Sequence, residues 1–132
     1  EKSSLCPLAG QVETYLYEPN ASILKAGAFR SLTQAYPVKK LHVNSHLYTS
    51  SSFVADFPGR KFKVESVTGF GKKELKGFLQ NLEKANLTVR NFPSSVAELR
   101  KRLKLKEGGE DYIFATTLSD GQKVLIRGRK VN

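Results

Sequence analysis

The 132-residue sequence lacks methionine and tryptophan and contains one cysteine, Cys6. A single cysteine cannot form an internal disulfide or supply the paired thiolates of a usual zinc site. No apolar run approaches the roughly 20 residues of a transmembrane helix, and the mixed, polar start of the chain lacks the pattern of a secretory signal. These absences indicate a cytoplasmic protein, and we expect neither a structural metal ion nor a membrane partner.

Methionine is missing even at position 1, which Glu1 occupies. Because translation starts with methionine, we expect the chain to be an excised piece of a longer protein. Any catalytic groups are then expected in the part that precedes it. The sequence makes no prediction of the oligomeric state.

Motifs that carry chemistry are also scarce. Gly69-Phe70-Gly71 lacks the third glycine of a dinucleotide-binding turn, and His42 and His46 are separated by residues that do not favour a helix. Ser50 to Ser52 lacks the glycines of a nucleophile elbow. We therefore predict no catalytic residue and no metal ligand, and we expect that the chain is not itself an enzyme. We interpret the acidic residues Glu107, Glu110 and Asp111 as part of a solvated turn.

The first part of the chain predicts a small α+β subdomain over 11–59, after a lead-in of residues 1–10. An alternating stretch rich in Tyr and Thr predicts a strand over Val12–Tyr17, which Pro19 should stop. Asn20 is a suitable cap for a helix over 21–35. One or two short strands are expected within 39–52.

The second part, 60–132, has a clearer pattern. Alternation predicts a strand over Lys61–Val67, and apolar residues at helical spacing predict a helix over Lys72–Ala85. A strand over Asn86–Phe92 precedes a second helix, which begins at a capping box, Ser95 to Glu98. Two more strands, Tyr112–Leu118 and Lys123–Lys130, flank a hairpin turn. The order β-α-β-α-β-β predicts a two-layer α+β sandwich, because both helices must pack on the same side of the sheet.

The charge is strongly positive and unevenly distributed. The formal net charge is +10, and residues 67–132 hold 14 Lys and Arg against 7 Asp and Glu. Such an excess indicates a polyanionic partner, with RNA or DNA ahead of membrane lipid. A basic surface that is merely soluble, or that meets an acidic patch elsewhere in a longer protein, is the alternative.

The cations fall into three groups. Those near the end of the second helix complement the helix dipole, which explains one or two of the five but does not require all of them. Those at the start of the first helix oppose its dipole, which favours a functional role. Two arginines on the last strand share a face with Lys123 and would extend a phosphate-binding surface if that face is open. The predicted nucleic-acid-binding residues are Lys72, Lys73, Lys76, Arg100, Lys101, Arg102, Lys104, Lys106, Arg127 and Arg129.

Aromatic residues on the predicted strands suggest two alternatives. Phe92, Tyr112 and Phe114 could stack on unpaired bases, as in single-stranded RNA platforms. Core packing is the interpretation that we favour for them, because no RNP-type motif accompanies them.

Three stretches carry a family resemblance. YLYEPNASILKAGAF (15–29), followed by HVNSHLYTS (42–50), resembles the C-terminal region of bacterial class I SAM-dependent methyltransferase-like proteins. VRNFPSSVAELRKRLKLKEGGEDYIFATTLSDGQKVLI (89–126) is similar to the THUMP-like domain of those proteins, which follows a ferredoxin-like domain. Together the matches span most of residues 13–130.

The resemblance implies a non-catalytic accessory region that binds RNA, either tRNA or rRNA. It also implies a preceding Rossmann-like methyltransferase domain that would hold S-adenosylmethionine, so no cofactor is expected in this chain. The alternative is a structural module that packs on that methyltransferase domain or mediates dimerisation. No binding residues are carried over from the family, so the predicted site rests on the charges alone.

Overall fold

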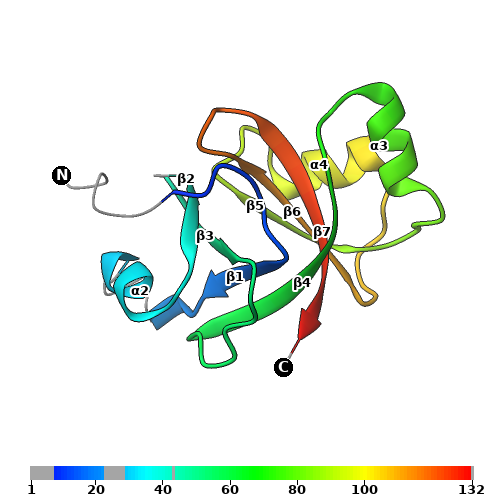
Figure 1. Cartoon of the computed structure of the whole chain (residues 1–132). Coiled ribbons are helices and arrows are strands. Elements are labelled where there is room, and N and C mark those ends of the chain that lie inside the picture. Colours follow the sequence, from blue (N-terminus) through cyan, green and yellow to red (C-terminus); the bar gives the residue numbers. More distant parts are fainter. Residues whose placement is uncertain (1–7, 23–28, 43, 132) are drawn as a thin grey trace.

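A computed structural model describes residues 8–22, 29–42 and 44–131, and its strands form one continuous sheet (Figure 1). The strand order is β2-β3-β1-β4-β7-β6-β5, and the pair β5–β6 is parallel whereas the other neighbours are antiparallel. The helices are α2 (Phe29–Ala35), α3 (Lys72–Leu79) and α4 (Val96–Leu103). The strands are β1 (Tyr15–Pro19), β2 (Lys39–His42), β3 (Ser45–Ser50), β4 (Gly59–Thr68), β5 (Asn86–Arg90), β6 (Asp111–Thr117) and β7 (Lys123–Val131).

The second half of the chain has the predicted order of elements, β4-α3-β5-α4-β6-β7. Both helices lie on the same face of the sheet (Figure 1), where Phe78 of α3 and Leu99 of α4 share a buried cluster with Ile113 and Leu125. The expected α+β class and the single helical layer are therefore confirmed.

The opposite face of these strands packs against the first half of the same sheet. Phe114 and Ile126, from β6 and β7, lie in one buried cluster with Leu16 and Leu47, from β1 and β3. These strands are separated by others in the sheet order, so the sheet must curl to bring their side chains together. The other face of the first half is covered by α2, whose Leu32 packs in a separate aromatic-rich cluster.

Glu18 joins the two halves across the curl. Its side chain is 9% exposed and accepts hydrogen bonds from Arg60 Nε at 2.7 Å and from Arg90 Nη2 at 2.8 Å. The Arg60 guanidinium also lies 5.5 Å from the ring centroid of Tyr112. One carboxylate therefore links β1, β4 and β5, and its two cationic partners offset the cost of removing it from water.

The predicted division at residues 59 and 60 falls at the start of β4, but no break in the sheet accompanies it. β1 pairs with β4 through the register Leu16↔Phe62, so strands from both predicted subdomains are hydrogen-bonded neighbours. The first part thus packs against the second and also continues the same sheet.

Two sequence-based predictions differ from the structure, and a third falls partly outside the described residues. The first strand begins at Tyr15 rather than Val12 and includes Pro19, which ends the strand opposite Gly59. The helix predicted to reach Ala85 ends at Leu79, because Gln80 leaves the helical conformation with a ψ of 129° and Asn81 follows with a φ of 64°. The helix predicted over 21–35 falls partly outside the described residues, and α2 forms its last part. The lead-in is described only from residue 8 onward.

Replacement of Glu18 by Gln is expected to lower the free energy of unfolding by about 1–3 kcal/mol, since Arg60 and Arg90 lose a charged acceptor but stay partly hydrated. Chemical denaturation of the two proteins checks this. An unchanged unfolding midpoint would contradict the role of this carboxylate in joining the two halves.

A second expectation concerns two glycines. A Cβ at Gly59 would overlap the Glu18 carbonyl oxygen and lie 2.8 Å from the Pro19 Cα, whereas a Cβ at Gly77 of α3 would meet nothing within 4 Å. Gly59→Ala should therefore destabilise the fold by at least about 2 kcal/mol. Gly77→Ala should stabilise it by about 0.5–1 kcal/mol, because alanine favours the helix. Thermal unfolding of the pair would show shifts of opposite sign.

Candidate nucleic-acid interface

The outer surface of the helical layer is basic because both helices are amphipathic. Leu99 and Leu103 are the buried positions of α4, and Phe78 is the buried position of α3. The polar positions between them are largely Lys and Arg. From Gly69 to Lys106 the sequence holds ten Lys and Arg against three Glu.

Helix α4 is fixed at both ends by local interactions. The Ser95 hydroxyl accepts a hydrogen bond from the Glu98 N–H at 3.1 Å, and the Glu98 carboxylate accepts from the Ser95 N–H at 2.9 Å. These hydrogen bonds lower the pKa of Glu98 below its ordinary value. Lys104 follows the helix in the left-handed conformation, with φ 57°. The predicted capping box is confirmed, and it sets where the basic end of α4 lies.

Helix α3 begins with two lysines in its first turn. Gly71 is the N-cap, and its N–H donates to the Glu74 carboxylate at 3.2 Å. Lys72 and Lys73 are exposed beside it, where the positive end of the helix dipole disfavours cations. Their position therefore does not stabilise the helix.

The basic end of α4 meets the start of α3 at a cation–π contact. The Arg102 guanidinium lies 4.9 Å from the ring centroid of Phe70, which directly precedes α3. Phe70 in turn stacks on Phe92, with ring centroids 5.6 Å apart. The contact therefore places the end of α4 beside the start of α3, the two helices that carry two of the three predicted groups of cations.

The other predicted helical cations lie within these two helices or just after α4. Lys76, Lys101, Lys104 and Lys106 are exposed. Arg100 is different, because it is half-buried and its Nη1 donates to the Ala85 carbonyl oxygen at 3.4 Å. Among the described residues, the salt bridges found involve none of these five side chains.

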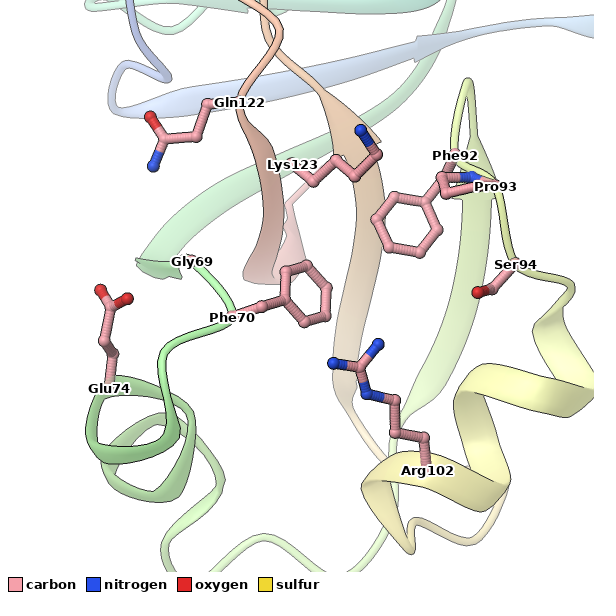
Figure 2. Close-up of a pocket in the computed structure, with 9 residues that line it drawn as sticks. All are labelled: Gly69, Phe70, Glu74, Phe92, Pro93, Ser94, Arg102, Gln122 and Lys123. Carbon is pink, nitrogen blue, oxygen red and sulfur yellow. The ribbon is translucent and has the colours of Figure 1, made fainter.

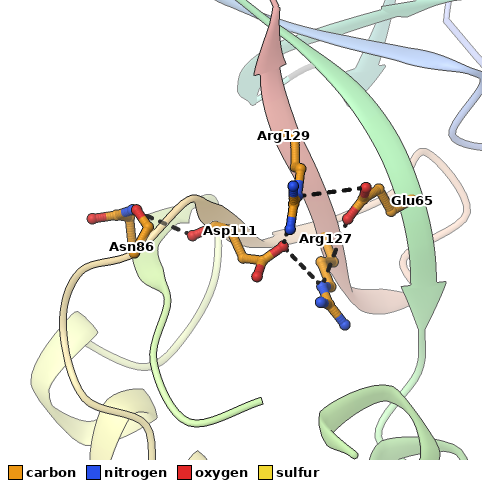
Figure 3. Close-up of polar contacts among 6 residues, drawn as sticks. Glu65, Asn86, Asp111, Arg127 and Arg129 are labelled. Atoms are coloured by element: carbon orange, nitrogen blue, oxygen red, sulfur yellow. Dashed lines mark hydrogen bonds and ion pairs between the residues drawn. The ribbon is translucent and has the colours of Figure 1, made fainter. Parts of the chain in front are cut away.

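The predicted arginines of β7 do not extend this positive surface. Arg127 Nε lies 3.2 Å from Asp111 Oδ1 and 3.9 Å from Glu65, and Arg129 Nε lies 3.6 Å from Asp111 Oδ1 and 3.7 Å from Glu65 Oε2 (Figure 3). Two cations alternate with two anions, so the local charge is balanced. The face is open at Arg129, whose side chain is 52% exposed, but the two carboxylates offset the charge of both arginines.

A hollow beside the Arg102–Phe70 contact contains residues that the charge pattern did not single out as a site. Gln122 and Lys123, at the start of β7, line it together with Phe70, Phe92 and Ser94 (Figure 2). The aromatic pair is the signal that points to it, since Phe92 is one of the strand aromatics and Phe70 lies between Gly69 and Gly71. Phe114 is fully buried and Tyr112 packs against the core, as expected.

The two histidines lie against other groups of the fold, and the acidic residues were considered with them as possible metal ligands. His42 Nδ1 accepts from the Asn44 N–H at 2.9 Å within the β2–β3 hairpin, and burial, with Lys40 and Arg90 nearby, lowers the pKa of His46. Across the part of the chain that the structure describes, no group of three or more potential metal-ligating His, Cys, Asp or Glu residues occurs. No helix within the same residues is long and apolar enough to cross a membrane.

Comparison with known proteins agrees with this architecture. Residues 15–58 match a ferredoxin-like domain and residues 59–130 match a THUMP-like domain. A crystal structure described as a "putative methyltransferase from Porphyromonas gingivalis W83" superposes with a TM-score of 0.88 at 42% sequence identity. The match covers 96% of this chain and 32% of that chain, so the chain spans about a third of its relative. Among curated proteins, none matches.

The chain therefore combines two domains in one sheet, a ferredoxin-like domain and a THUMP-like domain. It belongs to the THUMP-like family, which accounts for more than half of its length. The resemblance found in the sequence is confirmed, as is the association with a methyltransferase-related protein.

Substitution of Ser95 by Ala is expected to lower the free energy of unfolding by about 1 kcal/mol, because the Glu98 N–H loses its acceptor. Ser94→Ala is the matched control, since Ser94 makes no cap hydrogen bond. Equal unfolding midpoints for the two variants would show that the cap does not stabilise α4.

Proposed function

We propose that the chain is an RNA-binding accessory region of a methyltransferase-like protein and that it contributes no catalytic group. The observation that supports this most directly is the basic composition of the helical layer, in which the end of α4 contacts the start of α3 through Arg102 and Phe70. Lys72, Lys73 and Lys101 are exposed on these two helices and take part in no salt bridge found among the described residues. Phosphate groups of tRNA or rRNA are the anions that such a surface would contact.

The binding mode follows from the chemistry of these side chains. Lysine and arginine on the surface of a helix neutralise phosphates and release condensed counterions, so affinity falls steeply as salt rises. Such contacts position a nucleic acid but do not read its sequence. We therefore expect salt-sensitive binding with weak sequence preference. An accessory region for tRNA or rRNA would act in the cytoplasm.

S-adenosylmethionine would be held by another part of the longer protein. The glycine-rich turn before α3 does not fit a nucleotide cofactor, because the Glu74 carboxylate already accepts the Gly71 N–H and lies 3.1 Å from where a Gly69 Cβ would stand. An anionic group at this helix start would meet that carboxylate.

The second candidate is a structural module. The chain spans 32% of the P. gingivalis relative, so its basic face could instead pack on an acidic surface of the remaining part or on a second copy. In that case the same cations would be needed for assembly and not for RNA.

The decisive variant is Lys72→Glu with Lys73→Glu. Both changes place carboxylates at a helix N-terminus, which should stabilise α3, so a loss of binding cannot come from a weakened helix. We expect affinity for tRNA to fall roughly ten-fold at moderate salt, and the slope of log affinity against log salt to decrease by about 2.

The matched control is Lys39→Glu with Lys130→Glu, which makes the same change in net charge at exposed positions on β2 and β7, outside the helices. Fluorescence anisotropy with labelled tRNA measures all three proteins. Equal weakening by both pairs would reduce the effect to net charge, and unchanged binding by the helix pair would remove α3 from the interface.

A further inference from the structure

A hollow of about 400 Å³ opens where the start of α3, the end of α4 and the start of β7 meet (Figure 2). Its size lies within the range of small-ligand pockets, about 300–1,000 Å³. It is lined by Gly69, Phe70, Glu74, Phe92, Pro93, Ser94, Arg102, Gln122 and Lys123. It thus adjoins the basic helical surface.

One wall of the hollow is aromatic. Phe70 and Phe92 stack with an interplanar angle of 29°, and each ring is only partly buried. The Arg102 guanidinium lies over Phe70, so Phe92 offers the ring surface that remains for a planar ligand. Stacking on such a ring suits any nucleobase, because every base has a π-face.

The polar groups around this wall are available to a ligand. Figure 2 shows Arg102 reaching from α4 toward the two rings and Lys123 extending from β7 toward Phe92. Within the described residues, no carboxylate pairs with either cation. Ser94 and Gln122 add a hydroxyl and an amide, which can donate to and accept from the edge of a base.

We infer that this pocket binds one unpaired nucleotide of the RNA, an inference that rests on the proposed function. The base stacks on Phe92, and Arg102 and Lys123 hold its phosphate. A base in a duplex cannot enter, because both of its faces are already stacked. The Glu74 carboxylate repels phosphate at the opposite side of the pocket, so the phosphate lies toward Arg102 and Lys123 while Glu74 is left to accept a base amino group.

The test uses Phe92→Leu, which keeps an apolar side chain against the core but removes the ring. Phe53→Leu is the matched control, because Phe53 is a partly exposed phenylalanine outside the pocket. Each protein is titrated with a short single-stranded RNA of mixed sequence and with the same strand annealed to its complement. Phe92→Leu should weaken single-strand binding about five-fold or more and leave duplex binding unchanged. Phe53→Leu should change neither.

The outcomes separate the two proposals. If the unaltered protein binds neither RNA, the proposed function fails. If it binds both and Phe92→Leu weakens neither, or weakens both equally, the RNA surface stands and the pocket assignment fails.

A second measurement guards against a Phe92→Leu protein that does not fold. Amide NMR shifts of the unaltered protein during the single-strand titration should move at Ser94, Gln122 and Lys123. Shifts confined to α3 and α4 would overturn the pocket assignment.

Discussion

The carboxylate of Glu18 is the interaction on which the arrangement of the sheet depends. It lies almost fully buried between Arg60 and Arg90, which come from strands on opposite sides of the curl. A buried carboxylate with no partner would cost several kcal/mol, so this geometry is stable only while both arginines stay in place. The curl that brings them together also buries Phe62 and Phe114 between the two halves. Glu18 and Pro19 form the EP pair of the quoted motif, and both serve this junction.

The curl has a consequence for the surface. Because the inner face of β6 and β7 is covered by the first half of the sheet, the outer face is left for α3 and α4. Both helices therefore turn their polar sides outward from one layer, and their cations lie on the same side of the molecule. Farther along this face, Glu65 and Asp111 balance Arg127 and Arg129. The helices thus carry exposed cations that no salt bridge found among the described residues offsets.

Local sequence patterns were enough to predict the order of elements in the second half of the fold. The capping box at Ser95 and the spacing of Leu99 and Leu103 depend on neighbours within four residues, so the sequence shows them directly. The partners of Arg127 were hidden because they depend on the registers of β4 and β6 against β7, set by contacts far apart in the sequence. The sequence did not predict the Phe70–Phe92 stack for the same reason. Phe70 precedes α3 and Phe92 follows β5, so the contact joins two loops that are separate in the sequence. Pro19 ends β1 as the sequence predicts, and its partner, Gly59, leaves room for it that no other residue would.

The two proposed features complement each other physically. A surface of lysines holds a phosphate backbone in many registers, because each phosphate is equivalent and the contacts carry no sequence information. A single pocket that admits only an unstacked base would select one of these registers, since it would fix one nucleotide against Phe92. Arg102 belongs to both features: its position on α4 joins it to the basic surface, and its contact with Phe70 points its guanidinium at the pocket. RNA held at this residue would be placed in one register relative to any methyltransferase domain attached to the same chain.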